Sequence, residues 1–252
     1  MEPLPGQHFE LKEILNEVAT TPYNSVASIY RACGAEWDSK KYGNNCIGML
    51  RILKDTLPPS AQIQYLTTAH KDQIHVAAIV DGSYTDPFLS QTSPLPVGKM
   101  MNGDVVSVPS AIANQRIAGD IDGETLRIRL IKSFPSEDTS VERTLIEYQY
   151  NLSSALDVIP EDAEVVKLGT KYQYIFITNE GVPVRVEYDI RKDDLNILTF
   201  SCDFTGSNDE LKEYAEASMK EMYGLDFDSL VECFRSANEM EKYIRWNRST
   251  TY

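Results

Sequence analysis

Residues 74–86, Ile-His-Val-Ala-Ala-Ile-Val-Asp-Gly-Ser-Tyr-Thr-Asp, carry the pattern on which the fold prediction depends. The apolar run over residues 74–80 is typical of a buried β-strand. Asp81-Gly82 favours a tight hairpin turn, and residues 83–86 then form the returning strand. The sequence therefore predicts an antiparallel hairpin with a histidine near one end and an aspartate near the other.

The register of this hairpin decides whether the histidine and the aspartate can meet. When the two residues that flank the turn are paired, Asp86 lies opposite Ala77. His75 is two residues from Ala77 and on the same face, which makes His75 and Asp86 diagonal neighbours about 7–8 Å apart at the backbone. Across that backbone separation the two side chains can reach each other and form a hydrogen bond. A register change of one residue would instead put them on opposite faces of the sheet. The alternative is that His75 is a structural core residue whose hydrogen bonds are made beside the end of a strand.

Cys46 follows Tyr42-Gly43-Asn44-Asn45 and opens an amphipathic stretch that ends at Pro58-Pro59. The apolar residues recur at helical spacing and predict a helix over residues 46–56. Asn44 or Asn45 is placed to cap this helix, and its first-turn N–H groups and dipole favour a thiolate. The same N–H groups can receive an oxyanion. The alternative is that the cysteine is a small buried hydrophobe beginning a core helix.

Taken together, these three side chains form the set that thiol catalysis requires, namely a nucleophile, a base and an orienting carboxylate. We therefore predict that Cys46, His75 and Asp86 are the catalytic residues of an acyl-transfer reaction through a thioester. Asp86 would fix the tautomer of His75 and stabilise its imidazolium, and His75 would keep Cys46 as thiolate.

Three blocks of sequence carry a resemblance to a known family. Thr21–Val26 matches a proline-aromatic segment that precedes the nucleophile, and Tyr42–Cys46 stands where the family has an arginine, two glycines, a variable residue and the cysteine. His75 and its strand come next, followed by Thr85–Leu89 and Pro94–Pro96. In this order the blocks resemble the arylamine N-acetyltransferases, which belong to the wider transglutaminase-like group of cysteine enzymes.

The resemblance covers roughly residues 9–97 and includes two departures from the family. Tyr42 and Asn44 replace the family's arginine and second glycine, and the stretch between His75 and Asp86 is shorter than usual. The resemblance implies a ping-pong N-acyltransferase that uses a small-molecule amine as acceptor. It also implies an acyl-coenzyme A or acyl carrier protein thioester as co-substrate, with no permanently bound cofactor.

Two other functions remain open. The same triad would serve a transglutaminase-like amidase or peptidase, for which peptide or glutamine substrates rather than thioesters would be diagnostic. The replaced residues before Cys46 also fit a non-catalytic binding protein on the same fold, because a fold does not fix a function. An unreactive Cys46 would favour that third interpretation.

Composition limits the classes of function. A chain of 252 residues with 42% hydrophobic and 25% charged residues is expected to be globular, and its net charge of −14 argues against nucleic acid as a partner. No apolar run approaches about 18 residues, and the start of the chain lacks a secretion signal, so no membrane partner and a cytoplasmic location are expected. The four cysteines, Cys33, Cys46, Cys202 and Cys233, form no C-x-x-C pair, and no metal site is expected.

The order of helical and strand patterns predicts an α+β fold of three consecutive domains. Residues 1–60 form a helical subdomain with the nucleophile, and residues 207–252 form a C-terminal helical segment. Residues 61–206 form an antiparallel β-barrel or strongly curved sheet that carries the histidine and the aspartate. Within it, the alternation over residues 126–131 is typical of a half-exposed strand.

Overall fold

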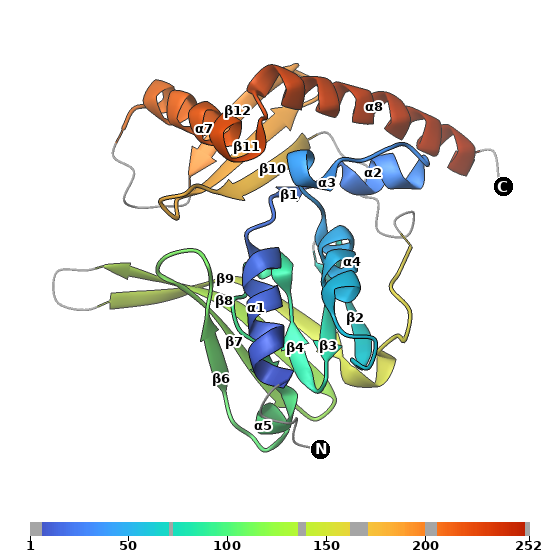
Figure 1. Cartoon of the computed structure of the whole chain (residues 1–252), viewed down its shortest axis with the longest axis vertical. Coiled ribbons are helices and arrows are strands. Elements are labelled where there is room, and N and C mark those ends of the chain that lie inside the picture. Colours follow the sequence, from blue (N-terminus) through green and yellow to red (C-terminus); the bar gives the residue numbers. More distant parts are fainter. Residues whose placement is uncertain (1–6, 71–72, 136–139, 162–170, 200–205, 250–252) are drawn as a thin grey trace. The chain divides into compact units, whose positions relative to one another are not determined.

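The computed structural model describes residues 7–70, 73–135, 140–161, 171–199 and 206–249. Its fold is α+β, with helices at the start, three antiparallel four-stranded sheets, and two helices at the C-terminal end (Figure 1). The chain divides into two compact units, each built from two stretches of sequence. The first unit comprises Met1–Thr20 and Met49–Pro160, and the second comprises Thr21–Gly48 and Glu161–Tyr252.

The first unit contains two of the sheets, β2-β3-β4-β5 and β6-β7-β8-β9. Their strands are β2 (Ile63–His70), β3 (Gln73–Val80), β4 (Ser83–Thr85), β5 (Leu95–Pro96), β6 (Val106–Pro109), β7 (Gln115–Asp122), β8 (Thr125–Pro135) and β9 (Ser140–Asn151). The helical elements are α1 (Gln7–Ala19), α4 (Cys46–Thr56), whose first three residues fall in the second unit, α5 (Val97–Met101), and the 3-10 turns η1 (Pro87–Leu89) and η2 (Leu152–Ser154).

One hydrophobic core joins the two sheets of the first unit. Tyr84 of β4 and Leu95 of β5 pack in the same cluster as Ile117 of β7, Ile128 of β8 and Tyr150 of β9, and all five side chains are fully buried. Burial of aromatic and branched side chains from both sheets is the main favourable contribution to folding here. The core therefore fixes the first sheet, which holds His75, against the second.

The predicted hairpin is confirmed at β3 and β4. Val80 pairs with Ser83, and the pairing continues to Ala78 and Thr85. Asp81 and Gly82 have φ values of 47° and 76°, so both turn residues adopt the left-handed conformation that suits the twist of a two-residue hairpin loop.

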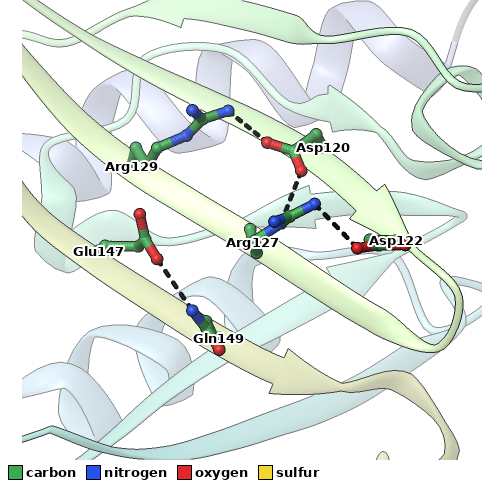
Figure 2. A network of polar contacts seen from close by, with 6 residues as sticks. All are labelled: Asp120, Asp122, Arg127, Arg129, Glu147 and Gln149. Atoms are coloured by element: carbon green, nitrogen blue, oxygen red, sulfur yellow. Dashed lines mark hydrogen bonds and ion pairs between the residues drawn. The ribbon is translucent and has the colours of Figure 1, made fainter.

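The sheet β6-β7-β8-β9 has one apolar and one charged face, as the alternation along β8 predicts. Leu126 and Ile128 are fully buried, whereas Arg127 and Arg129 are on the opposite face. Figure 2 shows both arginines bound to Asp120 of β7, with Arg127 Nε 2.8 Å from its Oδ1. These ion pairs are only partly buried, and pairs near the surface contribute little to stability, so this face is the more solvated side of the sheet.

The second unit contains the third sheet, β1-β10-β11-β12, and the C-terminal helices. Its elements are β1 (Tyr23–Asn24), α2 (Ala27–Ala32), α3 (Ser39–Tyr42), β10 (Lys171–Ile177), β11 (Pro183–Asp189), β12 (Asp194–Thr199), α7 (Asn208–Tyr223) and α8 (Phe227–Ser249). A capping box between Ser207 and Glu210 begins α7, and Gly224 in the left-handed conformation ends it. Aromatic side chains of β10 and β11 pack with those of α7 and α8 in one core.

Of the two forms predicted for residues 61–206, a β-barrel or a strongly curved sheet, the closed barrel is wrong for the described residues, because their strands form three separate sheets. Alternation shows which face of a strand is buried, but it does not show where pairing stops. The first and third sheets end at very short strands, β5 and β1. The sequence pattern also predicts strands at residues 105–108 and 126–131 with none between them, and so misses β7. The three consecutive domains stay a prediction, since the two compact units divide the chain by contacts and not by helix and strand content.

Replacing Gly82 by alanine should lower the free energy of unfolding by about 1–2 kcal/mol, because alanine is disfavoured at a φ of 76°. Gly98 in α5 is the matched control: its φ is not in the left-handed region, and a Cβ there meets no atom within 4 Å. Urea unfolding of both variants checks the prediction. If the two variants lose the same free energy of unfolding, or if neither loses any, the turn assignment is contradicted.

Candidate active site

In the first unit, His75 and Asp86 form the predicted hydrogen bond. His75 Nε2 of β3 lies 2.7 Å from Asp86 Oδ2, and Asp86 follows directly after β4. Because an ionised carboxylate only accepts hydrogen bonds, Nε2 carries the proton in this pair. Nδ1 is then the ring nitrogen that can take up a proton, which is the arrangement that a general base requires.

The carboxylate of Asp86 is fully buried, and His75 is only 5% exposed. Burying a charge is costly unless hydrogen bonds replace its water. Tyr84 Oη supplies one of them, donating to Asp86 Oδ2 at 2.9 Å, and lies 3.2 Å from Tyr150 Oη. Burial, followed by the charge of Asp86, raises the pKa of Tyr84 well above its ordinary value, so this hydroxyl remains a donor.

Gln91 fixes the backbone around the aspartate. Its side chain is fully buried, and its Oε1 accepts a hydrogen bond from the Asp86 amide at 2.7 Å. Its Nε2 donates to the carbonyl oxygens of Tyr84 at 3.0 Å and Ser93 at 2.7 Å. One glutamine thus joins the end of β4 to the chain beyond η1 and holds Asp86 at the point where the strand ends.

The imidazole of His75 lies between aromatic rings. It stacks on Tyr148 of β9, with ring centroids 4.2 Å apart and planes inclined by 15°, and it meets Phe88 of η1 at 5.0 Å. Stacking limits rotation of the imidazole about χ2. The histidine is therefore oriented both by its hydrogen bond to Asp86 and by packing.

Cys46 is the first residue of α4 and belongs to the second unit. Asn45 Oδ1 accepts a hydrogen bond from the Gly48 amide at 3.0 Å, which confirms Asn45 as the helix cap. The thiol is free and half-buried. It thus lies in the first turn of a capped helix, where backbone N–H groups can meet an anion.

Arg31 of α2 binds both asparagines that precede the cysteine. Its guanidinium donates to Asn44 Oδ1 at 2.8 Å and also to Asn45 Oδ1. The contact leaves no room at Gly48, where a Cβ would lie 2.2 Å from Asn44 Oδ1. A positive charge is therefore placed at the positive end of the α4 dipole, among carbonyl-type oxygens that offset it.

The two segments that precede Cys46, at Pro22–Asn24 and Gly43–Asn44, are bound to each other. The Asn44 amide donates to the carbonyl of Pro22 at 2.8 Å, and the Asn24 amide donates to the carbonyl of Asn44 at 2.9 Å. Gly43, the residue before Asn44, has a φ of 73°, and a Cβ there would lie 2.2 Å from the Pro22 oxygen. Only glycine fits at this position without strain.

The other cysteines are poorer candidates for a nucleophile. Burial raises the pKa of the Cys33 thiol, and it raises the pKa of Cys233 to about 12. Both shifts disfavour the reactive thiolate. Cys202 lies outside the described residues.

The structure therefore brings His75 and Asp86 together in the first unit. Cys46 and its capping loop belong to the second unit. Sequence reasoning missed Arg31, Tyr84, Gln91 and Tyr148. None of these residues belongs to a motif, and each acts through a contact distant in sequence or through a turn whose geometry the sequence leaves open. Only Tyr84, on the strand that ends at Asp86, carried a local signal.

Among the described residues, no group of three or more His, Cys, Asp or Glu side chains could hold a metal ion, and no helix is long and apolar enough to cross a membrane. Comparisons of the chain with protein-family models, with curated proteins and with solved structures found no match.

Replacing Tyr84 by phenylalanine should lower the free energy of unfolding at pH 8 by about 1–2 kcal/mol, because buried Asp86 loses a donor. The raised pKa of Tyr84 adds a pH dependence. Its stabilising contribution is complete below pH 10.0, the ordinary pKa, and is lost above it as the unfolded chain ionises first. Between pH 10 and 11 the wild type should therefore lose about 1 kcal/mol more than the variant.

Urea unfolding at several pH values measures both effects. Tyr243, which is 61% exposed, provides the control, and Tyr243→Phe should leave stability unchanged. Equal behaviour of the two variants would mean that Tyr84 does not support the carboxylate.

Proposed function

We propose that this protein is a cysteine-dependent N-acyltransferase that moves an acyl group from a thioester donor to an amine by a ping-pong mechanism. Cys46 is the nucleophile, His75 the base, and Asp86 the residue that orients the base. The observation that carries the proposal is the buried His75–Asp86 hydrogen bond of 2.7 Å. A capped helix that begins at a free cysteine supports it.

In the proposed mechanism, His75 Nδ1 accepts the proton of the Cys46 thiol, and Asp86 stabilises the imidazolium that forms. The sulfur attacks the carbonyl carbon of the thioester, and the amide of Cys46 with a neighbouring amide holds the oxyanion. The donor thiol leaves with a proton from His75. An amine then attacks the acyl-cysteine, gives up its proton to His75, and releases the thiol of Cys46.

The donor in this proposal is an acyl-coenzyme A or an acyl carrier protein, and the acceptor is a small amine. Both donors are anionic, whereas the chain carries a net charge of −14, so donor binding requires a local positive group. Arg31 provides a positive group at the loop before Cys46, through its bonds to Asn44 and Asn45. Water as acceptor would instead make the same triad an amidase or peptidase, and a protein amine would make it a transglutaminase.

A second candidate is a non-catalytic binding protein. The observation that favours it is the enclosure of His75, which is 5% exposed and stacked on Tyr148. A structural histidine paired with a buried aspartate would have the same surroundings. Reactivity of the thiol separates the two candidates.

Iodoacetamide should label Cys46 rapidly well below about pH 8.5, where an ordinary thiol is still protonated. His75→Gln retains a donor for Asp86 but no base, and labelling of Cys46 in this variant should shift to higher pH. Peptide mass spectrometry measures the rate at each cysteine, and Cys33, half-buried with a raised pKa, is the internal control. If Cys46 reacts no faster than Cys33 and ignores the histidine substitution, the nucleophile assignment fails.

Cys46→Ser should lower the rate of acyl transfer from thioester to amine by at least about 10³-fold, because a hydroxyl is a far weaker nucleophile in this setting. Cys33→Ser should leave the rate unchanged. The assay follows release of the donor thiol with a panel of amines, and circular dichroism checks that both variants are folded. Full activity of Cys46→Ser would contradict the mechanism, and peptide or glutamine turnover without thioester use would favour the amidase.

A further inference from the structure

A cavity of about 550 Å³ lies within the second unit, apart from the residues proposed for catalysis. It is bordered by α2, the loop that leads to α3, α3 itself, and the first three turns of α8. This volume is in the range of cavities that hold small organic ligands. The question is which chemistry its walls recognise.

One wall is aromatic. Tyr30, Trp37 and Tyr42 line the cavity, with ring centroids 4.9 Å apart for Tyr30 and Trp37 and 5.6 Å apart for Trp37 and Tyr42. Trp37 Nε1 donates to the carbonyl of Gly43 at 2.8 Å, and Tyr30 Oη donates to the carbonyl of Cys233 at 3.1 Å. Since these polar atoms already bind the backbone, the two side chains offer a ligand ring surface rather than hydrogen-bond donors.

Four of the other lining residues are acidic, and the remaining three are Ser229, Cys233 and Ser236. Glu36, Asp228 and Glu232 are exposed, and none forms an ion pair or a hydrogen bond with a residue that the structure describes. Asp38 also lines the cavity, although its Oδ1 caps α3 through the amides of Lys40 and Lys41. Four carboxylates beside one cavity repel anions and lower the energy of a cation.

The chain itself supplies one cation to this aromatic wall. Lys41 Nζ lies 5.2 Å from the centre of the Tyr42 ring, which is a cation–π distance. The wall therefore has the geometry to attract an ammonium group. A single lysine leaves an excess of negative charge beside the four carboxylates.

We infer that this cavity binds a small organic ammonium ion, with the charge between the carboxylates and the rings and the apolar body against the aromatic wall. Rings and carboxylates together distinguish such a ligand from both neutral and anionic molecules, because the ring faces and the carboxylates all favour positive charge. The cavity contains neither His75 nor Asp86. The inference therefore holds whether or not Cys46 is a nucleophile.

Choline and 3,3-dimethylbutan-1-ol provide the test, because they have the same shape and differ in charge. Trp37 fluorescence in a Trp246→Phe background, which leaves one tryptophan, reports binding at about 0.15 M ionic strength. Choline should saturate the signal, and the neutral alcohol should bind at least about tenfold more weakly. Saturation with equal affinity for both, or no saturation with choline, would overturn the inference.

A charge-matched pair of variants locates the site. Glu36→Gln with Glu232→Gln should weaken choline binding at least about threefold. Glu13→Gln with Glu124→Gln removes the same charge from exposed positions of the first unit and should leave affinity unchanged. An equal effect of the two pairs would show a response to net charge alone and would contradict a built site.

Discussion

The burial of the Asp86 carboxylate is the constraint around which the first unit is organised. A charge removed from water must be paired and hydrogen-bonded, and here the imidazole of His75 and the hydroxyl of Tyr84 meet the same carboxylate oxygen. The hairpin turn sets the register that brings His75 to it, and Gln91 fixes the backbone. Asp86 Oδ1 has no hydrogen-bond partner among the described residues, so loss of either contact at Oδ2 would leave the buried charge still less satisfied.

In the second unit, the main constraint is the sharp loop that precedes helix α4. Gly43 provides the left-handed backbone, and the Pro22–Asn24 segment pairs with the loop. Arg31 then occupies the oxygens of Asn44 and Asn45, of which Asn45 caps α4. A guanidinium thus reaches the loop before Cys46 from α2 and places a positive charge there.

Local features of the structure were predictable from the sequence, and features that depend on distant contacts were not. The turn at Asp81-Gly82 and the cap at Asn45 follow from the chemistry of one or two residues, so the hairpin register and the start of α4 are confirmed. The end of each sheet depends on which strands pair with one another. The sequence does not show where this pairing stops, and the barrel prediction was wrong for that reason. Strand β7 was missed because its pattern is interrupted at Gly119, where a Cβ would lie 2.7 Å from Met100 Sδ.

The same distinction applies to the candidate site. His75 and Asp86 are eleven residues apart in one hairpin, so their hydrogen bond could be predicted from parity alone. Tyr148, which stacks on His75, comes from β9, and Arg31 reaches the nucleophile loop from an earlier helix. The aromatic and acidic residues of the cavity in the second unit are likewise spread over α2, the loop between α2 and α3, α3 and α8, and no short motif marks them.

The central claim is that Cys46 and His75 act in one site, and a short bifunctional reagent tests it most directly. In 1,3-dibromoacetone each bromide can be displaced, first by a thiolate and then by a nearby imidazole nitrogen, leaving a bridge of three carbons. Peptide mass spectrometry after digestion should find Cys46 joined to His75, with no bridge in His75→Gln. Cys46 labelled only once, or bridged to a different residue, would contradict a shared site.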